Sequence, residues 1–176
     1  LPLELSGELA SGTVFAAMHW SGQHLSSGGI NELSQPAVDA RSRQPELKHA
    51  AVRVEPAAFG WHLLAARRGD ALALQAAVQP LLKACGYAGV SLHADATDTT
   101  QAWLVLRAAA DAAMQPDWLA ALDDALHLHP GADTLEYRDA RRGQLKRVAW
   151  RGSDAGNFID GLLWSGPQPG GQALLQ

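Results

Sequence analysis

A loop of glycines and polar residues at positions 21–48 carries the residue types best suited to bind a polar or anionic ligand. Gly28 and Gly29 lack a Cβ atom, so the main chain there is able to approach a bound molecule closely. Asn31 offers a paired donor and acceptor, and Lys48 supplies a compact positive charge. Such groups are most often placed on loops that a rigid sheet holds. The pattern predicts a ligand-binding loop, and the alternative is a polar loop that is merely solvated.

Two short apolar segments, residues 13–17 and 51–55, flank this loop and are predicted to be strands. Met18, His19 and Trp20 follow the first of them directly. At the end of a strand, these side chains either line a site or have structural roles. In the structural alternative, Met18 and Trp20 pack under the loop and His19 is a hydrogen-bonded surface residue.

The ordered run at residues 13–55 reads TVFAAMHWSGQHLSSGGINELSQPAVDARSRQPELKHAAVRVE. It resembles the C-terminal end of the molybdopterin-guanine-dinucleotide (MGD) binding domain in the DMSO reductase superfamily. Its Met-His-Trp version is most similar to that of assimilatory nitrate reductases. The resemblance implies that the first part of the chain is the C-terminal piece of a molybdopterin-dinucleotide-binding β-barrel.

The resemblance also implies roles for individual residues. Asn31 and Lys48 match, at a similar spacing, an Asn and a Lys that contact the cofactor in the family. Gly29 and His19 would add to the cofactor-binding surface, and Met18 would line the substrate funnel. Catalysis would belong to the molybdenum and its pterin ligands, with the protein setting position and electrostatics. No residue of this chain is therefore predicted to be catalytic or to ligate the metal.

The implied enzyme is a cytoplasmic molybdenum bis-MGD oxidoreductase that reduces nitrate to nitrite. A complete cofactor-binding domain of that kind has several strands before the matched segment, and such enzymes usually carry an iron–sulfur cluster on several cysteines. The sequence has one cysteine, Cys85. We therefore expect a C-terminal piece of a larger polypeptide, inactive and without bound cofactor by itself. Expected partners are the N-terminal domains of that polypeptide, an electron-donor protein or iron–sulfur module, and a second copy of the chain.

The composition of the chain argues against several classes of protein. The net charge is −4, the pI is near 5.9, and the two signs of charge are interspersed, which argues against a nucleic-acid-binding surface. The sequence has no run of about 20 apolar residues, so no membrane span is predicted. Cys85 lies in an alanine- and leucine-rich stretch and is predicted to be a small buried residue rather than a metal ligand.

The second half predicts strands and helices with defined ends. The expected strands are residues 60–67, 89–94, 101–108, 133–139, 144–150 and 158–164, and the expected helices are residues 70–85 and 116–126. Asp70 is able to cap the first helix, Pro80 is expected to kink or split it, and Gly86 to end it. Pro116 lies in the first turn of the second helix, which ends before Pro130. The apolar stripe of the first helix comprises Leu74, Val78, Leu81 and Cys85.

This order of elements is typical of a ferredoxin-like α/β sandwich, here of class α+β with an extra β-hairpin that turns at residues 141–143. Val90 and Leu92 are expected to face the helices, and the strand at 101–108 to be a central strand buried on both faces. The predicted domains are the barrel remnant at 1–56, the ferredoxin-like domain at 59–165 and a linker at 166–176.

Other charged groups in the second half have structural explanations. His127 and His129, with Asp123 and Asp124 one turn earlier, are metal-ligand types, but histidines at a helix C-terminus also complement the helix dipole. The basic residues around the late hairpin would receive an acidic electron donor or a neighbouring domain, or else protect a solvated sheet edge. They are Arg138, Arg141, Arg142, Lys146 and Arg147.

Two classes of function remain open. In the first, the chain is part of a molybdenum oxidoreductase, and its α+β half docks other modules. In the second, the α+β half is a non-catalytic binding or interaction domain, and the resemblance of the first segment is a coincidence. The molecular mass and metal content of the natural product would separate the two.

Overall fold

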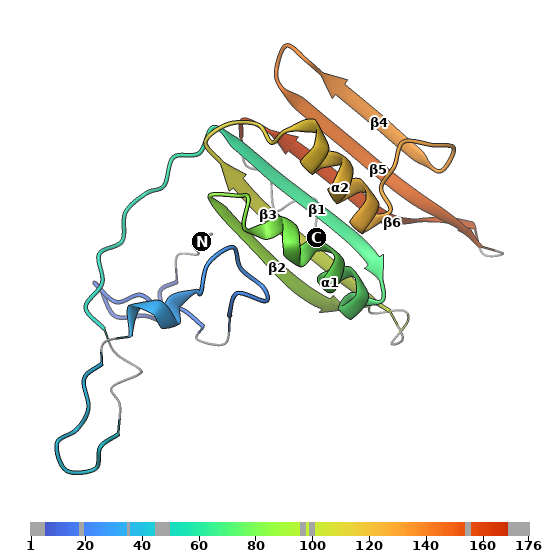
Figure 1. Cartoon of the computed structure of the whole chain (residues 1–176). Coiled ribbons are helices and arrows are strands. Elements are labelled where there is room, and N and C mark those ends of the chain that lie inside the picture. The colour runs from blue at the N-terminus through green and yellow to red at the C-terminus, as the bar shows by residue number, and fades with distance from the viewer. Residues whose placement is uncertain are drawn as a thin grey trace.

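The computed structural model describes residues 6–17, 20–34, 36–44, 50–95, 98, 101–153 and 156–168. Six described strands form one antiparallel sheet in the order β2-β3-β1-β6-β5-β4. The strands are β1 (Trp61–Gly69), β2 (Tyr87–Ala94), β3 (Ala102–Ala110), β4 (Thr134–Asp139), β5 (Gln144–Ser153) and β6 (Gly156–Gly166). The helices are η1 (Ile30–Leu33), a 3-10 turn, and the α-helices α1 (Ala71–Leu82) and α2 (Pro116–Leu126). Both α-helices cover one face of the sheet (Figure 1), so the α+β class is confirmed.

Helix α1 begins as its sequence predicts and ends earlier. Asp70 caps it, since the Asp70 carboxylate accepts hydrogen bonds from the main-chain amides of Leu72 and Ala73. Pro80 does not split the helix, which continues to Leu82 with Lys83 as its C-cap. Because Pro80 stands in the last turn, its missing N–H and its ring disturb little of the helix before it. The expected end at residue 85 is therefore three residues too late.

Helix α2 has the bounds that its sequence predicts. Pro116 is its first residue, and Asp117 places a carboxylate in the first turn. His127 ends the helix in a left-handed conformation, with φ 51° and ψ 47°. The amide of Leu128 then donates to the carbonyl of Asp123, which satisfies one of the last helical carbonyls.

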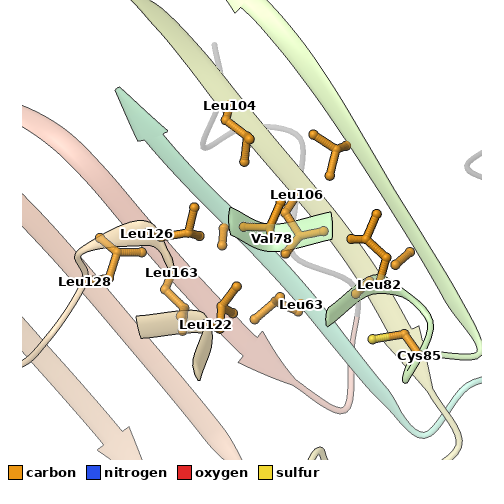
Figure 2. Packing of buried hydrophobic residues seen from close by; sticks show 14 of the residues in the cluster. Leu63, Val78, Leu82, Cys85, Leu104, Leu106, Leu122, Leu126, Leu128 and Leu163 are labelled. Carbon is orange, nitrogen blue, oxygen red and sulfur yellow. The ribbon is translucent and has the colours of Figure 1, made fainter. Parts of the chain in front are cut away.

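The main core lies between the helices and the sheet (Figure 2). Its largest fully buried side chains are Leu82, Leu104, Leu106, Leu122, Leu126, Leu128, Leu163, Val78 and Val90. On the other face of the sheet, Val105 packs with Leu64, Ala66 and two half-buried neighbours, Trp103 and Leu162. Strand β3 lies between β2 and β1 and is buried on both faces, as its sequence predicts.

Val90 and Leu92 share the helix-covered face, because they pair with Leu106 and Leu104 of the main core. Val90 is buried there, whereas Leu92 keeps 37% of its surface exposed. Strand β2 stands at one end of the sheet and has β3 as its sheet neighbour, so a side chain near the end of β2 has fewer groups to cover it.

The strands expected at residues 13–17 and 51–55 are absent, because both segments are irregular. A strand persists only when another strand takes up its main-chain N–H and C=O groups, and neither segment pairs with a strand in the described part of the chain. Their apolar side chains are exposed instead: Val14, Phe15, Val52 and Val54. No described helix has the length and apolar character needed to cross a bilayer.

Candidate functional site

The predicted ligand-binding loop is attached to the outer edge of β2. The amide of Ser26 donates to the carbonyl of Ala88 over 2.9 Å, and the amide of Val90 donates to the carbonyl of His24 over 2.7 Å. The Ser26 hydroxyl accepts a third bond from the amide of Ala88. These bonds extend the sheet by a short bridge, so the loop is held by the sheet edge.

Leu25 fixes the same segment by burial. It forms the bridge with Gly89 and is itself buried. A Cβ atom on Gly89 would lie 3.3 Å from a Leu25 methyl carbon, so the glycine leaves room for this anchor. The amide side chain of Gln75 on α1 also donates to the carbonyl of Gln23. The loop is therefore held by a strand, a helix and an apolar contact.

Gly29 occupies a conformation that side chains rarely adopt, with φ 77° and ψ −163°. A Cβ atom at this position would overlap the carbonyl oxygen of Trp20. The amide of neighbouring Gly28 donates to the Glu32 carboxylate over 3.0 Å. The close approach that the glycines allow is thus an approach of the loop to its own main chain, and it forms the turn that leads into η1.

Asn31 follows this turn as the second residue of η1 and is exposed. Its carbonyl accepts a hydrogen bond from the amide of Ser34, which closes the 3-10 turn. Gly29 and Asn31 are therefore two positions apart at the end of the anchored loop, with Ile30 between them. Lys48, His19 and Met18 lie outside the described residues, so their predicted roles stay predictions.

Replacing Gly29 with alanine is expected to release the loop from β2. The new Cβ atom would meet the Trp20 carbonyl in a backbone conformation that costs on the order of 1–3 kcal/mol for a side chain. Hydrogen exchange at the amides of Ser26 and Val90 should accelerate at least tenfold. Gly131→Ala is the matched control, because its Cβ atom would meet nothing within 4 Å. Unchanged exchange at both amides in Gly29→Ala would show that Gly29 does not hold the loop.

The Asp39 carboxylate, later in the same segment, accepts hydrogen bonds within its own turn. One carboxylate oxygen accepts hydrogen bonds from the amides of Ser42 and Arg41 and from the Ser42 hydroxyl. The hydrogen bonds from Ser42, then the one from Arg41, hold the pKa of Asp39 below its ordinary value. The group therefore stays ionised at neutral pH and is unsuited to act as a general acid.

A second concavity lies beside the C-terminal end of α2. It has a volume of about 400 Å³ and is lined by polar groups that include Arg67, Arg151, Asp160, His127 and His129. Asp160 joins the two arginines: it accepts from Arg67 over 2.9 Å and lies 3.2 Å from Arg151 Nε. Burial lowers the pKa of Arg67, and the charge of Asp160 opposes this change. The pocket is therefore floored by a buried ion pair.

The histidines near α2 do not meet both aspartates. His129 Nε2 lies 3.0 Å from Asp124, whereas Asp123 is bound to Arg147. Burial raises the pKa of Asp123, and the charge and hydrogen bond of Arg147 oppose that shift. No group of three His, Cys, Asp or Glu side chains among the described residues is arranged to hold a metal ion.

No family model, curated protein or solved structure matches this chain. Its function must be inferred from the anchored loop, the α+β unit and the resemblance of residues 13–55.

The ion-pair clusters are the features that sequence reasoning missed. Arg147 is buried between Asp123 and Glu136, and its guanidinium also donates to the carbonyl of Leu128. At the other end of the sheet, Arg68 binds Asp95 over 2.6 Å. Asp95 and Asp98 therefore belong to a loop held by Arg68 and are not an acid–base pair of their own. These clusters join strands to loops and helices, and they contain two of the buried charged residues, Arg147 and Asp95.

Proposed function

We propose that this chain contributes a cofactor-binding loop to a molybdenum bis-MGD oxidoreductase of the nitrate reductase type. The observation that carries the proposal is the position of Asn31 directly after the Gly29 turn, in a loop fixed to β2. The surrounding run of residues 13–55 resembles that family in its order. The larger enzyme would supply the metal and most of the cofactor site, and it would be cytoplasmic.

The loop has the physical properties that such a role requires. A ligand loop already held by three main-chain or side-chain bonds to the sheet loses little conformational freedom when the ligand binds. The Asn31 amide is able to donate to one ligand atom and accept from another, as the edges of a guanine or pterin ring demand. Lys48 would supply the cation for phosphate oxygens, Gly29 and His19 would add to the cofactor-binding surface, and Met18 would line the substrate funnel. The bound group would supply the redox chemistry.

The segments on either side of the loop fit a barrel that other polypeptide completes. Val14, Phe15, Val52 and Val54 are large apolar residues exposed on segments that a sequence reading assigns to strands. Pairing with further strands would cover these side chains and satisfy their main-chain groups. We therefore assign residues 13–17 and 51–55 to the barrel of the complete enzyme.

The second half is assigned a docking role in the same enzyme. The order β2-β3-β1-β6, with α1 and α2 on one face, supports a ferredoxin-like sandwich to which the β4–β5 hairpin would be an addition. An electron-donor protein or an iron–sulfur module are the partners expected for this half.

The second candidate function is a non-catalytic interaction domain. It is favoured by the fact that the α+β half has a complete core while residues 13–17 and 51–55 are irregular. Mass spectrometry and metal analysis of the natural gene product separate the two functions. A larger polypeptide with molybdenum and a guanine dinucleotide supports the oxidoreductase, and a metal-free product supports the interaction domain.

In the natural molybdenum-containing polypeptide, Asn31→Ala and Lys48→Ala are each expected to lower cofactor occupancy about tenfold or more. A lost hydrogen bond to a charged or buried partner costs on the order of 1.5–3 kcal/mol. Molybdenum and released guanine nucleotide would be measured on the purified proteins. Asn157→Ala, at an exposed position of β6, is the matched control. Full molybdenum and unchanged turnover in both loop variants would contradict the proposal.

A further inference from the structure

The two edge strands of the sheet, β2 and β4, differ in what covers their outer sides. At one end, β2 is covered by the bonds from His24 and Ser26. At the other end, β4 has β5 as its sheet neighbour, and no described segment pairs with its outer side (Figure 1). A strand in that position presents main-chain N–H and C=O groups to which another strand is able to bind.

The side chains of β4 alternate between the two faces of the sheet. Glu136 is directed to the helix-covered face, where it binds Arg147, and Arg138 lies beside it on the same face. Leu135 and Tyr137 point to the opposite face and remain 66% and 51% exposed. Strand β4 therefore combines an open edge, two exposed apolar side chains on one face and, on the helix-covered face, one charge of each sign.

We propose that β4 pairs with β4 of a second copy of this chain, antiparallel and about a two-fold axis at Tyr137. The two sheets would then form one continuous sheet with the helices of both copies on the same face. This inference is independent of the proposed function, since it uses the α+β half alone.

The charges of β4 select the register. In an antiparallel pair, residues directly opposite one another share a face, so Glu136 has to oppose a residue of the helix-covered face. With the axis at Tyr137, each Glu136 opposes Arg138 of the other copy, and the two tyrosines oppose each other. A shift of the axis to Glu136 would oppose the two glutamates, and a shift to Arg138 would oppose the two arginines. Like charges directly opposite are destabilising, whereas opposite charges and aromatic pairs stabilise.

The groups that would meet in this register are already held in place. Glu136 is fixed by two bonds from Arg147, of 2.6 and 3.0 Å to Oε2. Its Oε1 atom has a long contact of 3.4 Å to Arg138 Nε, which leaves it able to accept from the second copy. The Lys146 ammonium lies 5.9 Å from the centre of the Tyr137 ring. Pairing therefore needs little rearrangement, and this self-complementary pattern favours a second copy over an unrelated peptide.

The first test measures association of the 176-residue chain by sedimentation velocity over a range of concentrations. Because a six-residue strand makes a modest interface, the dimer should dissociate on dilution. Arg138→Glu would oppose two glutamates at both symmetry-related positions and should weaken association at least tenfold. Arg53→Glu, the same charge change at an exposed site outside the sheet, should leave association unchanged. A chain that is monomeric at every concentration, or a dimer indifferent to Arg138→Glu, overturns the proposal.

The second test checks the register by oxidation to a disulfide. Tyr137→Cys should cross-link, since opposite Cα atoms in an antiparallel pair are about 4.5–5.5 Å apart. Leu135→Cys should not, because its two copies would be four positions apart along the strands, roughly 13 Å. Burial raises the pKa of native Cys85 to about 11, so its thiol stays neutral and does not compete. Equal cross-linking of both variants, or none in Tyr137→Cys, contradicts this register.

Discussion

Replacing Arg147 with methionine is expected to lower the free energy of unfolding by about 3–5 kcal/mol. The Arg147 side chain is 2% exposed and binds Asp123, Glu136 and the carbonyl of Leu128. Methionine would fill part of the space but would leave two carboxylates and a carbonyl facing each other without a cation. Urea unfolding of the purified chain, followed by tryptophan fluorescence, measures the change.

Two further variants identify the cause of this loss. Arg142→Met removes an arginine whose side chain is 76% exposed on the same hairpin, and it should change stability by less than about 0.5 kcal/mol. Arg147→Met combined with Asp123→Leu and Glu136→Leu removes the unpaired carboxylates and should recover much of the loss. If Arg147→Met costs no more than Arg142→Met, Arg147 does not hold the hairpin to α2.

The pKa values of the two carboxyl groups bound to Arg147 shift in opposite directions. Burial raises the pKa of Asp123 more than Arg147 lowers it. Burial also raises the pKa of Glu136, but the bonds and charges of Arg147 and Arg138 outweigh it and hold that pKa below its ordinary value. Glu136 at the sheet edge therefore stays ionised at neutral pH, where β4 would pair.

The elements of the second half could be predicted because their signals are local. Pro116 and the residues after Leu126 fix the ends of α2, and Asp70 fixes the start of α1. The hairpin could also be predicted, because Gly143 adopts φ 60° in its turn. Once that turn is placed, the strand register puts Glu136 opposite Arg147. The ion pair between these two residues could therefore be predicted from the register alone.

The remaining buried charges could not be predicted because they depend on tertiary placement. Asp123 reaches Arg147 only when α2 lies over the hairpin. Asp160 is the extra residue of a bulge, since Ala149 pairs with Gly161 and Trp150 with Ile159. A one-residue slip of this kind turns a side chain to the other face, where Asp160 meets Arg67. Alternation along β6 would have assigned Asp160 to the wrong side.

The first half shows the limit of reading strands from apolar runs. Residues 13–17 and 51–55 have the composition of strands, but composition does not supply a partner. The lack of a Cβ atom at Gly28 and Gly29 predicts a close approach of the main chain to another group, and at Gly29 the carbonyl of Trp20 is such a group. The attachment of the loop to β2 has no signal in the sequence, because it depends on main-chain bonds at His24 and Ser26.

Truncation of Leu106 to alanine is expected to lower the free energy of unfolding by about 2–5 kcal/mol. Leu106 is fully buried on β3, between Val90 of β2 and Ala65 of β1, in the core that α1 and α2 cover. The lost methyl groups leave a cavity that strands paired on both sides are poorly able to close. Urea unfolding at low protein concentration measures the change without a contribution from association at β4.

Leu72→Ala is the matched control, because Leu72 lies in the first turn of α1 with 72% of its surface exposed. Its change should be near zero, since it leaves no cavity and alanine favours the helix. The comparison also tests whether the sheet and its helices are one cooperative unit. If they are, Leu106→Ala lowers the urea midpoint without changing the slope, and fluorescence and circular dichroism report the same transition. A loss below about 1 kcal/mol, or transitions that separate, would mean that β3 does not lie at the centre of a single core.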